Sequence, residues 1–402
     1  MFRSFSCTLA LVCLCSVPAL AQEAASAAVS PRAAASPVAA DEAARVRAVQ
    51  EYWTPERLAS AVPMHLPEAV GELVSPNAAP LSNEPVHSGG GGRPSFRDPA
   101  TAALSTERFP LNQGEAVSAD VSADASATPA AFSYEMPFNN YRAGNRNTFP
   151  YSAIGKLFFT VPPGTSEPPG TYVCSAAVAG IPSYVVVTAR HCVFDIVSKK
   201  FYTNWIFYPG WNNGADSTLH GAWHPSVVVT WVSANTLSLT TGWDIALMSM
   251  HDSTGTGCGG DRGRTIGSYT GWLGYTYGGS YAQRQWNIFG YPQGAPFEGN
   301  YLYQDNGATG IVDPLGSTNV VEVGNPQTGG TSGGPWVIGF DPGNATVPNP
   351  NNNTNPGLKN LVNGVNSFIW TNPSQPLALN GTVFTQANYW NLWLFLNSQP
   401  CV

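Results

Sequence analysis

After about Phe132 the chain alternates short apolar runs with turns. The runs are rich in β-branched and aromatic residues and are broken by Gly, Asn and Pro. Runs of this kind, bounded by turn residues, predict the strands of an all-β domain. We expect these strands at residues 156–160, 184–189, 204–208, 226–233, 245–250, 287–291, 310–312, 336–340 and 365–370.

The end of the chain has a helical pattern instead. Its apolar side chains recur at Tyr389, Trp390, Leu392, Trp393 and Leu396, a spacing that places them on one face of a helix. The segment is roughly ten residues long, whereas a helix that crosses a bilayer needs roughly 20. We therefore expect a terminal helix that does not span a membrane.

The N-terminal part has a different amino-acid composition. Residues 1–21 combine Arg3, an apolar run from Leu9 to Leu20 and the small-x-small end Ala19-Leu20-Ala21, which together predict a secretory signal peptide. Residues 22–132 are rich in Ala, Ser and Pro. A composition of this kind buries little apolar surface, so we expect this part to be largely disordered.

One stretch of that region, residues 41–64, predicts a docking helix. Thr54 is a candidate N-cap, and Pro55 suits the first position of a helix. An apolar stripe along it is expected from Trp53, Leu58, Val62 and Met64. A disordered linker is the alternative for residues 22–132.

Length and charge set the remaining limits. At 402 residues the chain exceeds a usual single domain. The changes in composition and pattern divide it into a signal peptide (1–21), a propeptide or linker (22–132) and a C-terminal domain (133–402). Only 11% of residues are charged and the formal net charge is −7. Neither part has the basic surface that binding to phosphates requires, so nucleic acid is not an expected partner.

The cysteines indicate an oxidising compartment. Removal of the signal peptide would leave Cys174, Cys192, Cys258 and Cys401. In an exported chain this even number predicts two disulfides, and four cysteines allow three pairings.

Three short motifs carry candidate chemistry. Ser332 lies in the glycine-rich run 329–335, His191 in the run 188–192, and Asp244 at the start of an apolar strand. A serine hydroxyl is a poor nucleophile at neutral pH, so acyl transfer needs a histidine to take its proton and a buried carboxylate to hold the imidazole. These three residue types together predict a serine nucleophile.

The motifs, in the order His, Asp, Ser, resemble those of the chymotrypsin-type serine peptidases. The resemblance runs from about Ile154 to the C-terminus. Residues 155–159 and 329–336 resemble most the secreted bacterial and fungal branch that includes the glutamyl endopeptidases. The resemblance implies an all-β, chymotrypsin-like double β-barrel whose terminal helix packs across the second barrel, preceded by a signal peptide and a largely disordered propeptide.

The resemblance also implies a role for each residue. His191 is general base and then general acid, Asp244 orients it, and Ser332 forms an acyl-enzyme that water hydrolyses. The N–H groups of Gly330 and Ser332 are expected to form the oxyanion hole. Thr331 stands where animal relatives have an aspartate that binds the new N-terminus, so inhibition by the propeptide is the expected control of activity.

Further expectations for the disulfides and the specificity pocket follow from the family. The cysteine after the catalytic histidine pairs upstream, which implies Cys174 with Cys192 and leaves Cys258 with Cys401. No acidic residue occurs in residues 324–332, so cleavage after Lys or Arg is disfavoured.

The pocket also departs from the glutamyl endopeptidases. These have a histidine on the wall strand where this chain has Asn366. Without that imidazole, a substrate carboxylate would be desolvated by neutral donors alone. We expect cleavage after uncharged residues, with Asn366 and Thr328 tuning the pocket.

Each candidate residue has a structural alternative. Ser332 could lie in a plain surface turn, His191 could be a structural histidine, and Asp244 could cap a strand. His220 and His224 have i, i+4 spacing, but Gly and Pro follow them and disfavour a zinc-binding helix. We expect no metal and no cofactor.

The expected protein is a secreted, monomeric serine endopeptidase made as a proenzyme. Its partners would be a protein or peptide substrate and its own propeptide, acting as an intramolecular inhibitor or chaperone, with no membrane involved. The main alternative is a catalytically silent, protease-like domain used for binding or adhesion. A hydrolase of another class fits the order of the motifs less well.

Overall fold

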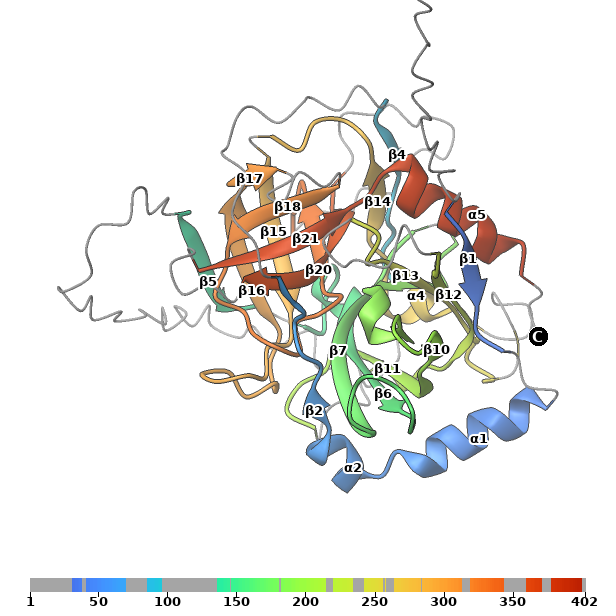
Figure 1. The fold of residues 1–402 in the computed structure, drawn as a ribbon. Helices are drawn as coiled ribbons and strands as arrows, with labels where there is room; N and C mark the ends of the chain where they lie inside the picture. Colours follow the sequence, from blue (N-terminus) through green and yellow to red (C-terminus); the bar gives the residue numbers. More distant parts are fainter. Residues whose placement is uncertain are drawn as a thin grey trace, which may run out of the picture.

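Two β-barrels lie side by side and form the body of the protein (Figure 1). The computed structural model describes residues 31–37, 41–69, 85–95, 136–144, 146–180, 182–214, 220–233, 242–255, 257, 264–282, 284–312, 319–342, 359–370 and 377–399. The predicted signal peptide, Cys258 and Cys401 lie outside these residues.

The first barrel is a closed antiparallel sheet. Its strand order is β12-β13-β8-β7-β6-β11, and a bridge between Phe207 and Trp223 joins β11 back to the start of β12, with hydrogen bonds of 2.8 and 2.9 Å. Its strands are β6 (Ile154–Val161), β7 (Gly170–Val178), β8 (Val185–Thr188), β11 (Thr203–Pro209), β12 (Pro225–Trp231) and β13 (Ala246–Met250). Both faces of these strands are largely buried, which explains their nearly continuous apolar sequences.

The second barrel closes in a similar way. The order is β18-β21-β20-β19-β15-β16, and β17, which follows β16 in the chain, pairs with β18. Its strands are β15 (Gln285–Gly290), β16 (Tyr303–Ala308), β17 (Ile311–Val312), β18 (Val320–Gly324), β19 (Pro335–Ile338), β20 (Leu361–Trp370) and β21 (Ala378–Val383). Trp286 and Trp336 pack edge to face in its core, with ring centroids 5.2 Å apart. The all-β double barrel is therefore confirmed.

Smaller elements complete the body. β5 (Phe138–Arg142) pairs with β16, and β14 (Gly274–Tyr277) pairs in parallel with β20. A small hairpin joins β9 (Phe194–Asp195) to β10 (Lys200–Phe201). The short helices are η1 (Tyr151–Ala153), η2 (Arg190–Cys192) and α4 (Ile266–Thr270).

The chain ends in a helix, as its sequence pattern predicts. A π-helical turn, η5 (Gln386–Trp390), leads into α5 (Asn391–Asn397). The expected position across the second barrel is wrong, because α5 contacts β12 and β13 of the first barrel. Its buried face, Leu392 and Leu396, belongs to the core of that barrel, and Trp231 Nε1 donates to Asn388 O at 2.7 Å. No helix in the described part of the chain is long and apolar enough to span a membrane.

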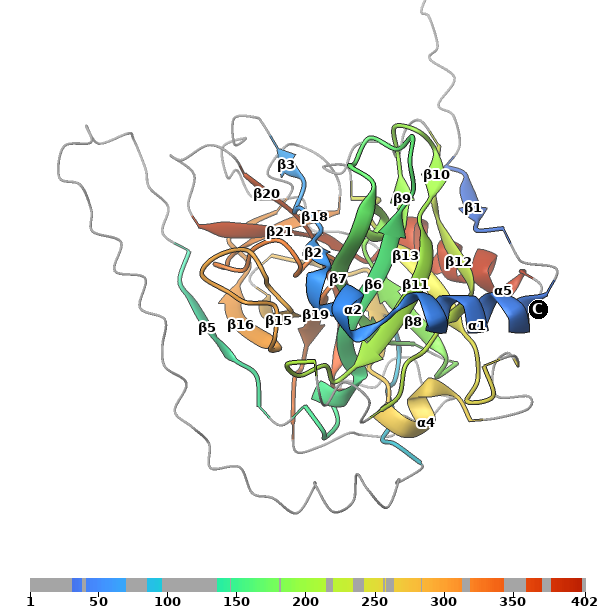
Figure 2. The ribbon, with the colours of Figure 1, turned by 90° about the horizontal axis from the view of Figure 1, so that it is seen from below.

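The N-terminal segment is far more structured than its composition predicts. α1 (Glu42–Tyr52) and α2 (Pro55–Ser60) lie against the first barrel (Figure 2). Thr54 caps α2 as expected, because its hydroxyl accepts from Arg57 N at 3.3 Å. Trp53 and Met64 are buried, but Val62 is 47% exposed and lies outside the expected apolar stripe.

Four short strands of the same segment extend both sheets. β1 (Ala33–Ala35) pairs with β12, β2 (Val62–Pro63) with β7, β3 (Glu68–Ala69) with β20, and β4 (His87–Gly89) with β14. The expectation of disorder is wrong for these residues. Main-chain pairing needs no large apolar side chain, so an Ala-rich stretch can add a strand that a composition argument overlooks.

Candidate active site

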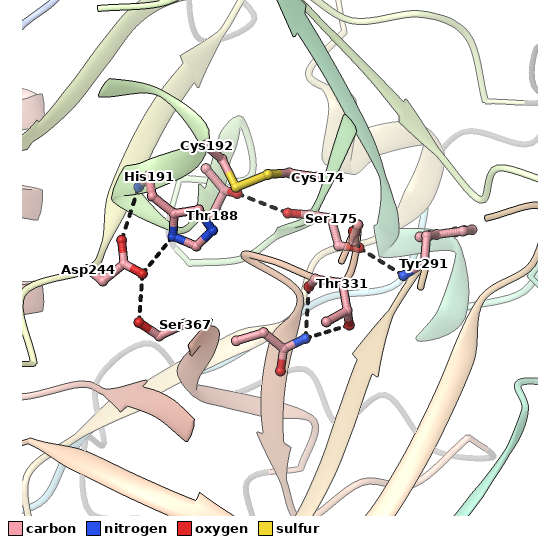
Figure 3. Close-up of a disulfide and its surroundings, with 11 residues drawn as sticks. Cys174, Ser175, Thr188, His191, Cys192, Asp244, Tyr291, Thr331 and Ser367 are labelled. Atoms are coloured by element: carbon pink, nitrogen blue, oxygen red, sulfur yellow. Dashed lines mark hydrogen bonds and ion pairs between the residues drawn. A yellow bond between two sulfur atoms is a disulfide. The ribbon is translucent and has the colours of Figure 1, made fainter. Parts of the chain in front are cut away.

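His191 is placed by the end of a buried strand. β8 ends at Thr188, and the short helix η2 then turns the chain so that His191 lies in the space between the barrels, with 9% of its surface exposed. A disulfide joins Cys192 to Cys174 of β7 and fixes this turn (Figure 3). It is the pair that the family resemblance implies.

Asp244 is fully buried just before β13 and is bound to His191 twice. Its Oδ1 accepts from His191 N at 3.0 Å, and its Oδ2 lies 2.8 Å from His191 Nδ1. An ionised carboxylate only accepts hydrogen bonds, so Nδ1 carries the proton and Nε2 is left as the basic nitrogen. This is the tautomer that a general base requires.

Two further side chains stabilise the Asp244 carboxylate. Ser367 Oγ on β20 donates to Oδ2 at 2.6 Å, and the guanidinium of Arg190 lies near enough for electrostatic attraction. Burial alone would raise the pKa of Asp244, but the charge and hydrogen bond of His191, with Arg190 and Ser367, outweigh it and lower the pKa. Burial lowers the pKa of Arg190 to about 10, so it stays charged at neutral pH.

Ser332 lies in a tight turn between β18 and β19 that only glycine permits. Gly330 has φ +94° and Gly333 φ +77°, a backbone region that L side chains rarely adopt. A Cβ on Gly330 would come within 2.7 Å of Tyr291 O, and one on Gly333 within 2.1 Å of Thr188 Oγ1. The turn is therefore packed directly against the segment that leads into His191.

The same turn is bonded to the disulfide strand. Ser175, next to Cys174, donates from its N–H to Ser332 O at 2.7 Å and from its hydroxyl to Gly330 O at 2.9 Å. Tyr291 N donates to that hydroxyl at 2.8 Å. Through Ser175, the Ser332 turn is therefore bonded to β7, the strand that carries Cys174.

Asn366 supports the turn from the opposite side. Its Nδ2 donates to Thr331 O, Thr331 Oγ1 and Phe289 O at 2.9 Å, and its Oδ1 accepts from Trp336 Nε1 at 2.6 Å. Thr331 Oγ1 in turn donates to Gln327 Oε1. Asn366 is fully buried and bonds to the Ser332 turn, to Phe289 and to Trp336. Its role in tuning the pocket stays a prediction. Thr328, the other residue expected there, donates from Oγ1 to Gly294 O at 2.8 Å.

The two atoms that would exchange the catalytic proton are both buried. Ser332 Oγ and His191 Nε2 have no hydrogen-bond partner among the described residues, although buried polar atoms are normally satisfied. Catalytic hydrogen bonds are often long without substrate. An unpaired hydroxyl and an unpaired basic nitrogen are what a serine nucleophile and its general base would require.

The N–H of Gly330, one of the two expected oxyanion-hole donors, has a partner from the N-terminal segment. It donates to Met64 O at 3.1 Å. A carbonyl oxygen is the group that an oxyanion hole receives from a substrate. The site is thus covered by the chain's own residues.

Among the residues that the structure describes, His220 and His224 do not belong to a close group of three possible metal ligands. His220 and His224 are buried, and burial is the main cause that lowers the pKa of each to about 4, so both are neutral at pH 7. In the described part of the chain, the one close group of three possible ligands is His191 with Cys174 and Cys192, whose sulfur atoms are bonded to each other.

Sequence reasoning missed three residues of this site. Ser367, Arg190 and Ser175 were not singled out. Arg190 directly precedes His191, and Ser175 directly follows Cys174. Their position next to motif residues could therefore have pointed to them. Their partners lie far away in sequence and become visible only in the fold.

Comparison with known proteins gives structural neighbours alone. No family model and no curated protein matches the chain. Among solved structures, it is similar to the thermostable serine protease AL20 from an extremophilic microorganism, at 25% identity and TM-score 0.48, over 62% of this chain and 98% of that one.

It is also similar to the protease Anisep from Arthrobacter nicotinovorans, at 24% identity and TM-score 0.46, over 62% of this chain and 96% of that one. A Glu endopeptidase in complex with MPD matches at 15% identity and TM-score 0.42, over 67% and 100%. In its double barrel and in the chain order of His191, Asp244 and Ser332, the protein resembles the chymotrypsin-like serine peptidases.

Proposed function

We propose that this protein is a secreted serine endopeptidase, made as a proenzyme, in which Ser332, His191 and Asp244 form the catalytic triad. The observation that carries the proposal is the pair of bonds from His191 to a fully buried Asp244. They leave Nε2 as the basic nitrogen, and the Ser332 turn supports the proposal because Gly333 packs against Thr188 and Ala189, just before His191.

In the proposed reaction, His191 Nε2 takes the proton of Ser332 Oγ while Oγ attacks the carbonyl carbon of a peptide bond. The N–H groups of Gly330 and Ser332 stabilise the oxyanion. The imidazolium then protonates the leaving amine, and water hydrolyses the acyl-enzyme by the same route. Asp244, held by Ser367 and Arg190, stabilises the positive charge on the imidazole.

Substrate preference is part of the proposal. Residues 324–332 contain no acidic side chain, so a substrate Lys or Arg would find no partner there. We expect cleavage after uncharged residues. Fragment mass spectrometry after digestion of a protein of known sequence reports this preference, and a profile dominated by Glu, or by Lys and Arg, would contradict it.

The experiment that tests the proposal is prolonged labelling with a fluorophosphonate, followed by peptide mapping. This reagent reacts irreversibly with an activated serine, so even a covered site accumulates label. We expect the label on Ser332 in the wild-type chain, and none there in His191→Ala. Absence of label on Ser332 at all times would support the alternative of a silent, protease-like binding domain.

A further inference from the structure

Residues 61–69 cross from one barrel to the other at the candidate active site. β2 pairs in parallel with β7 of the first barrel, where Val62 lies opposite Tyr172. β3 pairs in parallel with β20 of the second barrel, where Glu68 lies opposite Ile369. In Figure 2 this blue segment runs beside both barrels. One stretch of extended chain therefore uses strand edges of both barrels.

The main chain of Met64 connects this segment to the catalytic groups. Its N–H donates to Val173 O at 2.9 Å, and its carbonyl accepts from Gly330 N at 3.1 Å. Farther along, Pro67 O accepts from Ile369 N at 3.0 Å. The Met64 carbonyl, which accepts from the expected oxyanion-hole donor, is thus held in place by main-chain bonds on both sides of it.

Side chains also hold the segment in the site. Gln293 Nε2 donates to Ala61 O at 3.0 Å, while Gln293 Oε1 accepts from the buried Lys156 Nζ at 3.3 Å. Met64 and Leu66 are 2% and 3% exposed. The segment lies so close to the nucleophile turn that a Cβ on Gly329 would come within 3.1 Å of Met64 O.

We infer that residues 61–69 are a built-in inhibitor, which binds as an extended peptide strand between the edges of β7 and β20 and fills the oxyanion hole with the Met64 carbonyl. The inference rests on the proposed function. Ser332 is fully buried with the segment in place. A peptide substrate must therefore displace this segment and would bind the same two strand edges.

The test uses the full chain and compares two substitutions at one position. Met64→Pro removes the N–H that bonds Val173 O and leaves the rest of the segment intact. Met64→Leu keeps that N–H and nearly the same side-chain volume, so it is the matched control. The measurement is the rate at which a fluorophosphonate labels Ser332.

Loss of this hydrogen bond, together with a poorer fit, should weaken the binding of residues 61–69 in the site by about 1.4 kcal/mol or more. We expect Ser332 in Met64→Pro to react at least about tenfold faster than in wild type, and Met64→Leu to stay within about twofold of wild type. Equal rates in all three chains, with Ser332 labelled, would overturn the inference and leave the proposed function standing. No label on Ser332 in any chain would overturn both.

Hydrogen exchange keeps the inference testable if Met64→Pro does not fold. In the full-length Ser332→Ala chain, we expect the amides of Met64, Gly330 and Ile369 to be protected as a group. Exchange of the Met64 amide as fast as in a free peptide would overturn the inference. Cleavage of the Met64–His65 bond by the wild-type protein would also overturn it, because the segment would then be a substrate.

Discussion

Asn366 fixes Thr331 with a single amide nitrogen, which lies 2.9 Å from both the carbonyl oxygen and the hydroxyl oxygen of Thr331. Thr331 directly precedes the proposed nucleophile Ser332. Its hydroxyl also donates to Gln327. The turn is therefore stabilised by neutral groups at the position where animal chymotrypsin-type peptidases carry an aspartate.

Asn366→Ala should destabilise this turn strongly. It leaves Trp336 Nε1 without its acceptor in a fully buried site and removes one donor each from the carbonyl oxygens of Phe289 and Thr331. Unsatisfied buried polar groups cost about 1–3 kcal/mol each, so we expect the free energy of unfolding to fall by about 3 kcal/mol in denaturant titrations. Asn397→Ala, at an exposed site, is the control. A loss below about 0.5 kcal/mol in Asn366→Ala would contradict the role assigned to this amide.

Ser367→Ala should weaken catalysis with little effect on folding. The substitution removes the 2.6 Å hydrogen bond to Asp244 Oδ2, and hydrogen bonds to charged groups contribute about 1.5–3 kcal/mol. We expect kcat/KM on a peptide substrate to fall about 10- to 100-fold, and about 10⁴-fold in Asp244→Asn, which would favour the wrong tautomer of His191. Ser398→Ala, at an exposed hydroxyl, should leave kcat/KM unchanged. Equal kcat/KM for Ser367→Ala and wild type would mean that Ser367 does not support the carboxylate.

Loss of the Cys174–Cys192 disulfide should destabilise the first barrel. The two residues are 18 positions apart, and closure of a loop of that size is worth about 3 kcal/mol in the chain-entropy model. We expect the double variant Cys174→Ser with Cys192→Ser to unfold at lower denaturant by about this free energy. The wild-type chain with reductant should approach the variant, and a variant as stable as the oxidised wild type would refute the estimate.

Acid should loosen the N-terminal segment through Glu42. Burial raises the pKa of this carboxyl, but hydrogen bonds from Arg45 and His251 outweigh it and lower the pKa below 4.5. Because the folded-state pKa is depressed, the stabilisation is present above about pH 4.5 and is lost as pH falls through the folded value. His224 also faces this cluster, and burial lowers its pKa to about 4.

Hydrogen exchange of the α1 amides, relative to those of β13, measures this effect. After correction for intrinsic rates, we expect α1 to exchange faster at about pH 3 than at pH 7. In Glu42→Gln we expect faster exchange already at pH 7, because the free energy of opening α1 falls by about 1–3 kcal/mol. Glu51→Gln, on the same helix but exposed, is the control. An identical pH response in wild type and Glu42→Gln would exclude Glu42 as the anchor.

Much of the body is predictable from local pattern. Every apolar run expected to be a strand overlaps one in the structure, since buried strands need β-branched and aromatic residues wherever they lie. Among the strands of the two barrels, β7, β16, β18 and β21 were missed, and these contain Gly, Asn, Thr or Ser. Their identity depends on pairing with neighbours distant in sequence, as in the register of Val320 opposite Thr382.

The same distinction between local pattern and distant contacts applies to the candidate site. His191, Asp244 and Ser332 carry local motifs, so they could be found from the sequence. Ser367 could not be assigned to Asp244, because the two are 123 residues apart and belong to different barrels. The contact of Met64 with Gly330 was likewise unpredictable, since it uses main-chain atoms that leave no trace in side-chain chemistry.

Digestion of a protein of known sequence, followed by fragment mass spectrometry, tests the central claim most directly. The wild-type protein and its Ser332→Ala variant, purified identically, are compared at equal concentration and time. Since the triad acts as a unit, the account predicts that Ser332→Ala lowers the rate of fragment formation by about 10⁴-fold or more. The same fragments at the same rate from Ser332→Ala would show that Ser332 is not the nucleophile.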